Sequence, residues 1–253
     1  MKLYAYQNAF FSYQQAGSLS SARVVIPHLL EHLKVKSVLD VGCGAGAWVT
    51  AYLESGLTDV IGVDGEYVHE DQLLFSRSKF IAIDITHPFF LKRQFDLVQC
   101  LEVAEHIDPS ASETLINNLV KHASIVLFSA APPGQGGEHH INEQPYQYWR
   151  HLFEKHDFLP FDFLRPRIRE HVDVESWYRY NTMIFVRRDV VQDLPQMVSQ
   201  SLVNPNVRIL DIAPVAYRMR RKLLSLLPSS VITYMALLKH WAILLSRSMR
   251  SAR

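Results

Sequence analysis

The sequence is poor in cysteine, and its last part lacks two further residue types. Cys43 and Cys100 are the only cysteines among the 253 residues, too few for a disulfide framework or a metal knuckle. No acidic residue follows Asp211, and no glycine follows Gly137. The N-terminus lacks the continuous apolar core of a secretory signal. We therefore expect a cytoplasmic protein whose C-terminal part differs from the rest.

These shifts in composition divide the chain. Apolar residues make up 48% of it, enough for a sizeable core. We interpret residues 1–188 as one α/β domain, in which residues 1–34 form a helical cap. Residues 189–253 form a basic, helical C-terminal extension in this interpretation.

The most informative stretch is Lys36–Trp48, which reads KSVLDVGCGAGAW. Its aliphatic run Val38–Val41 is typical of a strand buried on both faces of a parallel sheet. The loop that follows is rich in glycine, so its backbone can turn sharply and approach a ligand. Because a helix N-terminus with free N–H groups comes next, the stretch predicts a nucleotide site.

Two acidic residues bear on the ligand of this site. Gly42, Gly44 and Ala47 satisfy the loose dinucleotide pattern G-x-G-x-x-G/A, which alone is a weak signal. Asp40 lies two residues before the first glycine, where a carboxylate would repel a pyrophosphate and attract a cationic amino-acid group. Asp64 follows the loop by about twenty residues, a separation that suits hydrogen bonds from both ribose hydroxyls. The alternative for Asp64 is a capping or surface role.

Short apolar runs alternate with helical segments along the domain. After the first strand, the runs cover residues 59–64, 80–85, 95–100 and 124–128. The alternation predicts a doubly wound α/β fold with a parallel sheet and ligands at its carboxyl edge. The Pro- and Gly-rich loop 130–142 lies where the substrate mouth is expected. A helix over 143–153, with Pro145 in its first turn, comes next.

The pattern D/E-x-G-x-G-x-G, met by Asp40, Gly42, Gly44 and Gly46, resembles the first motif of the class I S-adenosylmethionine-dependent methyltransferases. The runs FDLVQCLEVAEHI and PGQGGEHHINEQPYQYW resemble a bacterial group of small members of this class with an undefined acceptor. The resemblance implies S-adenosylmethionine as cofactor and a Rossmann-like, seven-stranded sheet of five parallel strands and a C-terminal antiparallel hairpin. That hairpin would comprise residues 159–164 and 181–187, with an excursion near the acceptor, including Trp177 and Tyr178, between them.

The same resemblance implies which residues surround the donor. Asp84 would accept a hydrogen bond from the adenine amino group, or else serve as a loop residue. A helix over residues 18–33, with Ser18 and Ser20 as cap candidates, would cover the pocket. It would bring Tyr13, Gln14 or Arg23 near the ligand, unless these side chains only cap and solvate the helix. The predicted donor-binding residues are Asp40, Gly42, Cys43, Gly44, Gly46, Trp48, Asp64, Gly65, Asp84, Ile85, Leu101 and Glu102.

Four residues on the carboxyl-edge loops are candidates for catalysis: Glu105, His106, His139 and His140. A hydroxyl acceptor needs a general base, and histidine titrates in a suitable range. The alternative is that these are ordinary loop histidines. The run Glu102-x-x-Glu105-His106 also resembles the segment with which small-RNA 3′-terminal 2′-O-methyltransferases bind a divalent metal together with a later His. Similar L-E-V-x-E-H runs occur in metal-free members, including ubiquinone-pathway O-methyltransferases, so we predict no metal ligand and keep a divalent metal as the alternative.

The function implied by the resemblance is methyl transfer from S-adenosylmethionine to a small-molecule or glycan acceptor. The histidine-rich loop favours oxygen as the methylated atom. Two alternatives stay open. A nicotinamide-dependent oxidoreductase would use the same glycine turn, and a partner protein would bind S-adenosylmethionine without turnover.

The basic extension carries its own apolar pattern. Apolar residues recur at helical spacing over 231–245, but Lys239 and His240 interrupt a run that is too short for a simple membrane span. Together with residues 218–227, this pattern favours either helices on an anionic membrane surface, at the inner face of the membrane, or a helix pair packed on the body or on a second subunit. Nucleic acid is not favoured as a partner, because aromatic residues for base stacking are sparse there.

Overall fold

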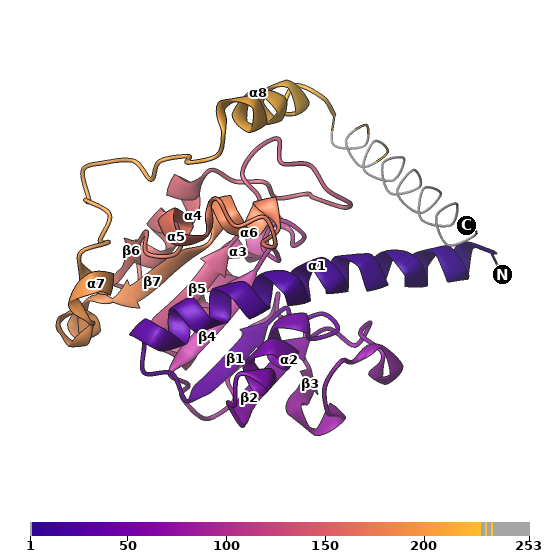
Figure 1. Ribbon diagram of the computed structural model, residues 1–253, viewed down its shortest axis with the longest axis horizontal. Helices are drawn as coiled ribbons and strands as arrows, with labels where there is room; N and C mark the ends of the chain where they lie inside the picture. The colour runs from indigo at the N-terminus through magenta and orange to yellow at the C-terminus, as the bar shows by residue number, and fades with distance from the viewer. Residues whose placement is uncertain (1, 229–230, 232–233, 235–253) are drawn as a thin grey trace.

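The computed structural model describes residues 2–228, Val231 and Tyr234, with side chains from residue 16 onward. Its centre is one seven-stranded sheet in the order β3-β2-β1-β4-β5-β7-β6 (Figure 1). The strands are β1 (Ser37–Val41), β2 (Asp59–Asp64), β3 (Phe80–Ala82), β4 (Leu97–Leu101), β5 (Ile125–Ser129), β6 (Phe158–Phe161) and β7 (Met183–Arg187).

The pairing of the strands confirms the predicted Rossmann-like topology. Strands β1 to β5 are parallel to their neighbours, whereas β7 is antiparallel to both β5 and β6. The chain order runs outward from β1 in one direction and from β4 in the other. A switch point therefore lies between β1 and β4, and a ligand crevice is expected at their carboxyl ends.

Helices cover both faces of the sheet. They are α1 (Lys2–His32), α2 (Ala47–Glu54), α3 (Ser112–His122), α4 (Tyr146–Glu154), α5 (Arg165–Ile168), α6 (Ser176–Asn181), α7 (Gln196–Ser199) and α8 (Val215–Leu224). Short 3₁₀ helices occupy Glu70–Gln72, Arg77–Lys79, Pro109–Ala111 and Arg188–Asp193.

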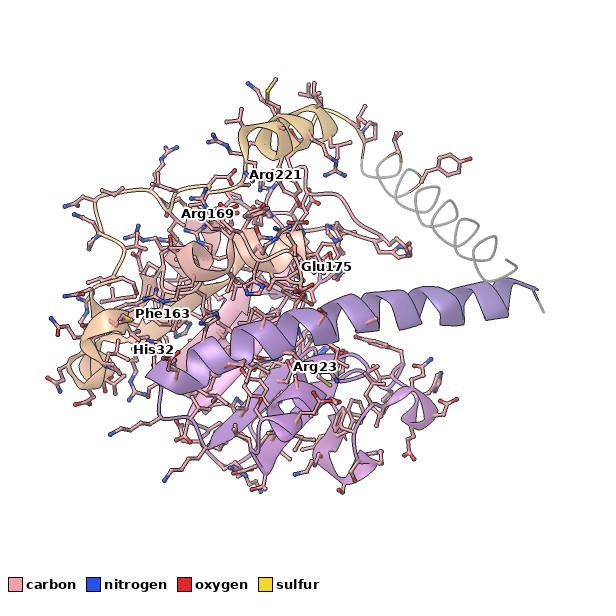
Figure 2. All side chains as sticks on the ribbon, in the orientation of Figure 1. Arg23, His32, Phe163, Arg169, Glu175 and Arg221 are labelled. Atoms are coloured by element: carbon pink, nitrogen blue, oxygen red, sulfur yellow. The ribbon has the colours of Figure 1, made fainter. Side chains whose placement is uncertain are left out.

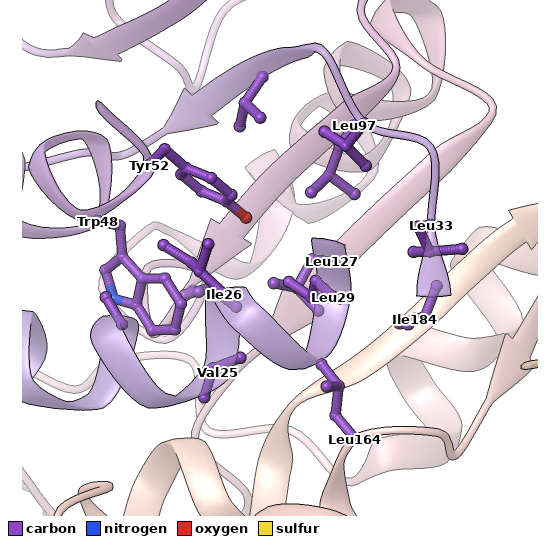
Figure 3. Packing of buried hydrophobic residues seen from close by; sticks show 14 of the residues in the cluster. Val25, Ile26, Leu29, Leu33, Trp48, Tyr52, Leu97, Leu127, Leu164 and Ile184 are labelled. Carbon is purple, nitrogen blue, oxygen red and sulfur yellow. The ribbon is translucent and has the colours of Figure 1, made fainter. Parts of the chain in front are cut away.

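The period-two pattern of the strands builds two hydrophobic cores. Val38 and Leu127 belong to the core under α1 and α2, whereas Leu39 and Val126 belong to the core under α3 and α4. Figure 3 shows the first core, in which Leu29 of α1 packs among side chains of the sheet. Both faces of the central strands are thus buried, as their continuous apolar sequences predict.

Helix α1 is longer than the sequence indicated. It begins at Lys2, so the two predicted cap residues lie inside it. Ser18 Oγ lies 3.0 Å from the hydroxyl of Tyr178, and Ser20 Oγ donates to the carbonyl of Asp173. The two serines therefore tie α1 to the segment between β6 and β7 instead of capping a helix.

Three other boundaries differ from the sequence predictions. Strand β3 pairs with β2 only over Phe80–Ala82, because it is an edge strand with one neighbour. Helix α4 begins at Tyr146, since Pro145 is its N-cap residue and has an extended backbone. Strands β6 and β7 form the predicted antiparallel pair with the predicted excursion between them, but β6 ends at Phe161 and β7 begins at Met183.

The segment 189–213 packs against the sheet domain. Val198 lies in the core under α1, and Ile209 lies in the opposite core. The guanidinium of Arg150 donates to the carbonyl of Val207, and that of Arg165 donates to the carbonyl of Leu210. The division at residue 188 stays a prediction, but these contacts tie the first part of the extension to the domain.

Helix α8 follows this segment and fits the prediction of a helical extension. Its residues Val215–Leu224 lie along one edge of the molecule (Figure 1). In the part of the chain that the structure describes, no helix is long and apolar enough to cross a membrane. Most of the predicted helix 231–245 lies outside the described residues.

Candidate active site

The glycine loop after β1 is open on one side. Gly42, Gly44 and Gly46 have φ angles of 78°, 53° and 85°, in the left-handed region that favours glycine. A Cβ on Gly42 would collide with the side chain of Val103, and one on Gly46 would collide with the ring of Phe75. A Cβ on Gly44 would meet no atom within 4 Å. The backbone at Gly44 can therefore be approached closely by a ligand.

Asp40 is a buried carboxylate beside this loop. It is 3% exposed, and its Oδ2 has no hydrogen-bond partner among the described residues. Burial raises the pKa of Asp40 to about 7, the Gln99 side chain lowers it, and the negative charge of Asp64 raises it further. A buried carboxylate with one unpartnered oxygen is stabilised by a cationic ligand group. The amino-acid part of S-adenosylmethionine supplies such a group, so the residues fit this cofactor.

Asp64 holds the loop from the neighbouring strand end. Its Oδ2 accepts a 2.6 Å hydrogen bond from the backbone N–H of Gly44, and its Oδ1 accepts one of 2.7 Å from the N–H of Gly65. The hydroxyl of Tyr67 also donates to Oδ1. Asp64 thus lies at the glycine loop, where the sequence placed a ribose-binding acid.

Several predicted donor residues have protein partners of their own or lie in the cores. Asp84 has a side chain 62% exposed and accepts hydrogen bonds from Thr86 and His87, which lower its pKa. Trp48 packs against the ring of Tyr178 in the core under α1. Leu101 is buried in the core under α1 and α2, Ile85 is buried in the opposite core, and Cys43 is half-buried.

Helix α1 gives the donor pocket no described polar contact. Arg23 pairs with Glu54 of α2 through two hydrogen bonds of 2.8 Å, and both side chains are exposed. This is the surface role that the sequence left open. The side chains of Tyr13 and Gln14 lie outside the described residues.

Glu102 anchors a polar network at the end of β4. Its φ angle of 55° is unusual for a residue other than glycine. One carboxylate oxygen accepts a 2.6 Å hydrogen bond from the amide of Gln135, and the other accepts one of 3.2 Å from the amide of Asn181. The Asn181 amide also donates to Gln135. The network joins the end of β4, the loop 130–142 and the end of α6.

Glu105 and two histidines form a second cluster. Glu105 is fully buried, and neither of its carboxylate oxygens has a hydrogen-bond partner in the described part of the chain. Burial and the neighbouring Glu102 raise its pKa well above the ordinary range. Glu105, His106 and His140 each offer a ligand atom, and these atoms lie within 4.8 Å of one another. The three residues could therefore hold a cation.

His140 has a fixed orientation in this cluster. Its Nδ1 lies 2.8 Å from Oε1 of Glu143, and its ring meets that of His106 edge to face at 4.8 Å between centroids. Partial desolvation lowers the pKa of His106 to about 4, and the neighbouring His140 lowers it further, although the residue is still exposed. His139 is exposed, with a φ angle of 58°. The structure thus brings Glu105, His106 and His140 together and leaves His139 at the surface.

Glu143 is a residue of this cluster that sequence reasoning missed. Its carboxylate accepts hydrogen bonds of 2.7 and 2.8 Å from the N–H groups of Gly134 and Gly136. Although burial would raise its pKa, the hydrogen bonds from His140 and these two groups lower it. The spacing His140-x-x-Glu143 was a signal for this pair. No sequence signal marked Gln135 or Asn181, whose partners lie far away in the chain.

The two clusters are adjacent to the glycine loop. The side chain of Val103, next to Glu102, lies against Gly42, and the carbonyl of Glu105 accepts hydrogen bonds from the N–H groups of Ile141 and Asn142. The loop 130–142 is therefore fastened to the segment after β4. Donor loop, polar network and histidine cluster lie side by side at the carboxyl edge of the sheet.

Comparison with known proteins defines the class of this site. Residues 17–167, more than half of the chain, match the model of a methyltransferase domain family. The chain belongs to this family, and its class is that of the S-adenosylmethionine-dependent class I methyltransferases. The resemblance seen in the sequence is confirmed, and the alternative of a nicotinamide-dependent oxidoreductase finds no support.

Curated relatives cover part of the chain. The ubiquinone biosynthesis O-methyltransferase of Neisseria meningitidis serogroup C (strain 053442) is 32% identical over 137 residues, which are 50% of this chain and 52% of that protein. The protein of the same name from Pseudomonas fluorescens (strain SBW25) is 36% identical over 106 residues, 39% of this chain and 45% of that protein. The chain thus spans about half the length of these relatives.

A solved structure supports the fold. Magnesium protoporphyrin IX methyltransferase from Synechocystis PCC 6803, with bound S-adenosylhomocysteine, superposes with a TM-score of 0.52 at 16% identity. The match covers 74% of this chain and 95% of that one. At this identity the likeness supports the fold alone.

Proposed function

We propose that the protein transfers a methyl group from S-adenosylmethionine to a hydroxyl oxygen of a small-molecule or glycan acceptor. The observation that carries the choice of oxygen is the contact between His140 Nδ1 and the Glu143 carboxylate. The names of the curated relatives, which are O-methyltransferases, support the same choice.

The geometry of His140 suits a general base. The lowered pKa of Glu143 keeps this carboxylate ionised. An ionised carboxylate favours the His140 tautomer in which Nδ1 carries the hydrogen and donates a hydrogen bond to Glu143. Nε2 is then free to accept the proton of an acceptor hydroxyl. A Cβ on Gly137 would collide with this Nε2, so only glycine leaves room beside the nitrogen.

The remaining residues bind and position. S-adenosylmethionine supplies a methyl group already activated by its sulfonium, so the protein has to align the reactants and exclude water. Asp40 and the glycine loop bind the donor, and the network of Glu102, Gln135 and Asn181 fixes the loop that borders the acceptor. The N–H groups of Gly134 and Gly136 hold Glu143 in place.

A divalent cation is the second candidate for activating the acceptor. The unpartnered oxygens of buried Glu105, together with the nearby nitrogens of His106 and His140, favour it. Such a cation would be held by these three side chains and would polarise an acceptor hydroxyl. Glu143 would orient His140 in this case as well.

The test needs the acceptor first. Cell extract is incubated with the protein and isotopically labelled S-adenosylmethionine, and mass spectrometry identifies the product with the labelled methyl. With that acceptor, His140→Gln is expected to lower kcat by about 100-fold or more. Its affinity for S-adenosylhomocysteine, measured by calorimetry, should equal that of the unchanged protein. Full activity of His140→Gln would refute the role of His140 as the general base.

A chelator separates the two candidates. Protein dialysed against a chelator should keep its activity if His140 is the base. Loss of activity that Mn²⁺ restores, with calorimetric binding of Mn²⁺ that Glu105→Gln abolishes, would establish the cation instead. Replacement of the exposed His139 by Gln is the matched control and should leave both readouts unchanged.

A further inference from the structure

The inner face of α8 contacts α6, the segment 189–213 and the loop 130–142. The ring of Tyr217 lies 5.5 Å from that of Tyr180, and the buried guanidinium of Arg221 pairs with Asp211. The backbone of α8 comes so close to Gly134 that a Cβ there would lie 1.9 Å from the carbonyl oxygen of Arg221. In Figure 2, Arg221 lies between α8 and the domain. The orientation of α8 is therefore set by its polar and aromatic residues.

The outer face of α8 is apolar, the reverse of an ordinary surface helix. Val215, Met219 and Leu223, at i, i+4 and i+8, are 62%, 63% and 67% exposed. Leu226, just beyond the end of the helix, is 78% exposed. The three side chains on the helix form one stripe that points away from the domain, because Tyr217 and Arg221 occupy the opposite side of the helix.

Basic side chains flank this stripe. Arg218 and Lys222 are both exposed and lie beside it at helical spacing. No acidic residue follows Asp211 in the sequence, so α8 itself carries no carboxylate side chain to neutralise them. The outer face of α8, defined here as Val215, Arg218, Met219, Lys222 and Leu223, is thus both apolar and cationic.

We propose that the outer face of α8 docks on the surface of an anionic lipid bilayer. Apolar side chains can enter the boundary between headgroups and acyl chains, while the flanking cations meet lipid phosphates. A second copy fits less well, since two such helices would bring Arg218 and Lys222 against like charges. Nucleic acid would leave the apolar stripe exposed.

The position of α8 relates this surface to the active site. Arg220 Nη1 donates to the backbone carbonyl of Gln135, whose side chain binds Glu102. Docking would therefore turn the edge that carries the loop 130–142 toward the bilayer. The proposal itself needs neither donor nor acceptor, so it can be tested even if the proposed reaction fails.

The test uses flotation of the full-length protein with two vesicle preparations, one of phosphatidylcholine and one of phosphatidylcholine with phosphatidylglycerol. We expect enrichment with the anionic vesicles and loss of that enrichment in Met219→Asp/Leu223→Asp. The variant Arg218→Gln/Lys222→Gln should bind these vesicles about 25-fold more weakly, roughly fivefold for each charge. Val172→Asp is the matched control, because Val172 is an apolar residue that is 85% exposed outside α8.

Two results would overturn the proposal. One is a flotation result that does not depend on this surface: equal recovery of the protein with both vesicle types, or enrichment with anionic vesicles that Met219→Asp/Leu223→Asp leaves unchanged. The other is concentration-dependent self-association without lipid that this variant abolishes, which would make a second copy the occupant. Binding of S-adenosylhomocysteine, measured by calorimetry on every variant, confirms that the fold is intact.

Discussion

At the scale of single residues, Asp40 makes donor binding depend on pH. Its pKa is raised from the ordinary value near 3.8 to about 7, chiefly by burial. The folded protein therefore holds a proton there that the unfolded chain has lost, and this contribution to stability disappears as the pH rises through 7. A cationic donor needs the ionised carboxylate, so donor binding below this pH must release the proton.

This linkage predicts how affinity varies. The affinity for S-adenosylmethionine should fall by up to about tenfold for each pH unit below 7 and level off above it. Calorimetry in two buffers with different ionisation enthalpies should detect about one proton released at pH 6 and almost none at pH 8. In Asp40→Asn the affinity should be low and independent of pH. The same pH dependence in that variant would show that another group is responsible.

The residue scale also marks where sequence reasoning reached its limit. Asp40, Gly44 and Asp64 could be placed together because a parallel sheet brings successive strand ends to one edge. The partners of Glu102 could not, since Gln135 and Asn181 lie 33 and 79 residues away in the chain. Such contacts depend on how loops fold back on the sheet, and composition and spacing carry no signal for that.

At the scale of elements, the buried strands were the most predictable part. Their β-branched and aliphatic runs match β1, β2, β4 and β5 to within a few residues, because both faces of each strand had to be apolar. The ends of helices were less predictable. Ser18 and Ser20 look like helix caps, yet α1 begins at Lys2. Local sequence does not reveal that these hydroxyl groups have partners on α6 and on the segment just before it.

The contact between α8 and Gly134 can be tested with two glycines. Gly134 and Gly56 have φ angles of 79° and 92°, so alanine is strained at both. Only at Gly134 does the added Cβ also collide with the backbone of α8, because Gly56 faces open space. Gly134→Ala should therefore lower the free energy of unfolding by about 1–3 kcal/mol more than Gly56→Ala.

Limited proteolysis shows which element this substitution releases. A helix of ten residues is marginal once it has lost its tertiary contacts, so α8 should unwind in Gly134→Ala. Trypsin should then cleave after Arg218 or Lys222 faster than in the unchanged protein or in Gly56→Ala. Equal cleavage rates in the three proteins would mean that α8 is held elsewhere.

At the scale of the whole molecule, the C-terminal extension consists of two parts with different relations to the domain. Residues 189–213 supply Val198 and Ile209 to the two cores and accept hydrogen bonds from Arg150 and Arg165. Helix α8 adds mainly a surface. The chain becomes basic only after Asp211, close to residue 213, where the packing of this segment on the domain ends.

Two truncations test this division. A chain ending at residue 188 loses the burial of Val198 and Ile209, about 1.5–3 kcal/mol each, and leaves the guanidinium groups of Arg150 and Arg165 without these carbonyl partners. At about 2–4 °C per kcal/mol, its Tm should fall by at least about 6 °C. A chain ending at residue 213 should melt within a few degrees of the full-length protein, bind S-adenosylhomocysteine equally well and lose flotation with anionic vesicles. Differential scanning calorimetry gives both Tm values. If the chain ending at 188 were as stable as the one ending at 213, residues 189–213 would not be part of the folded unit.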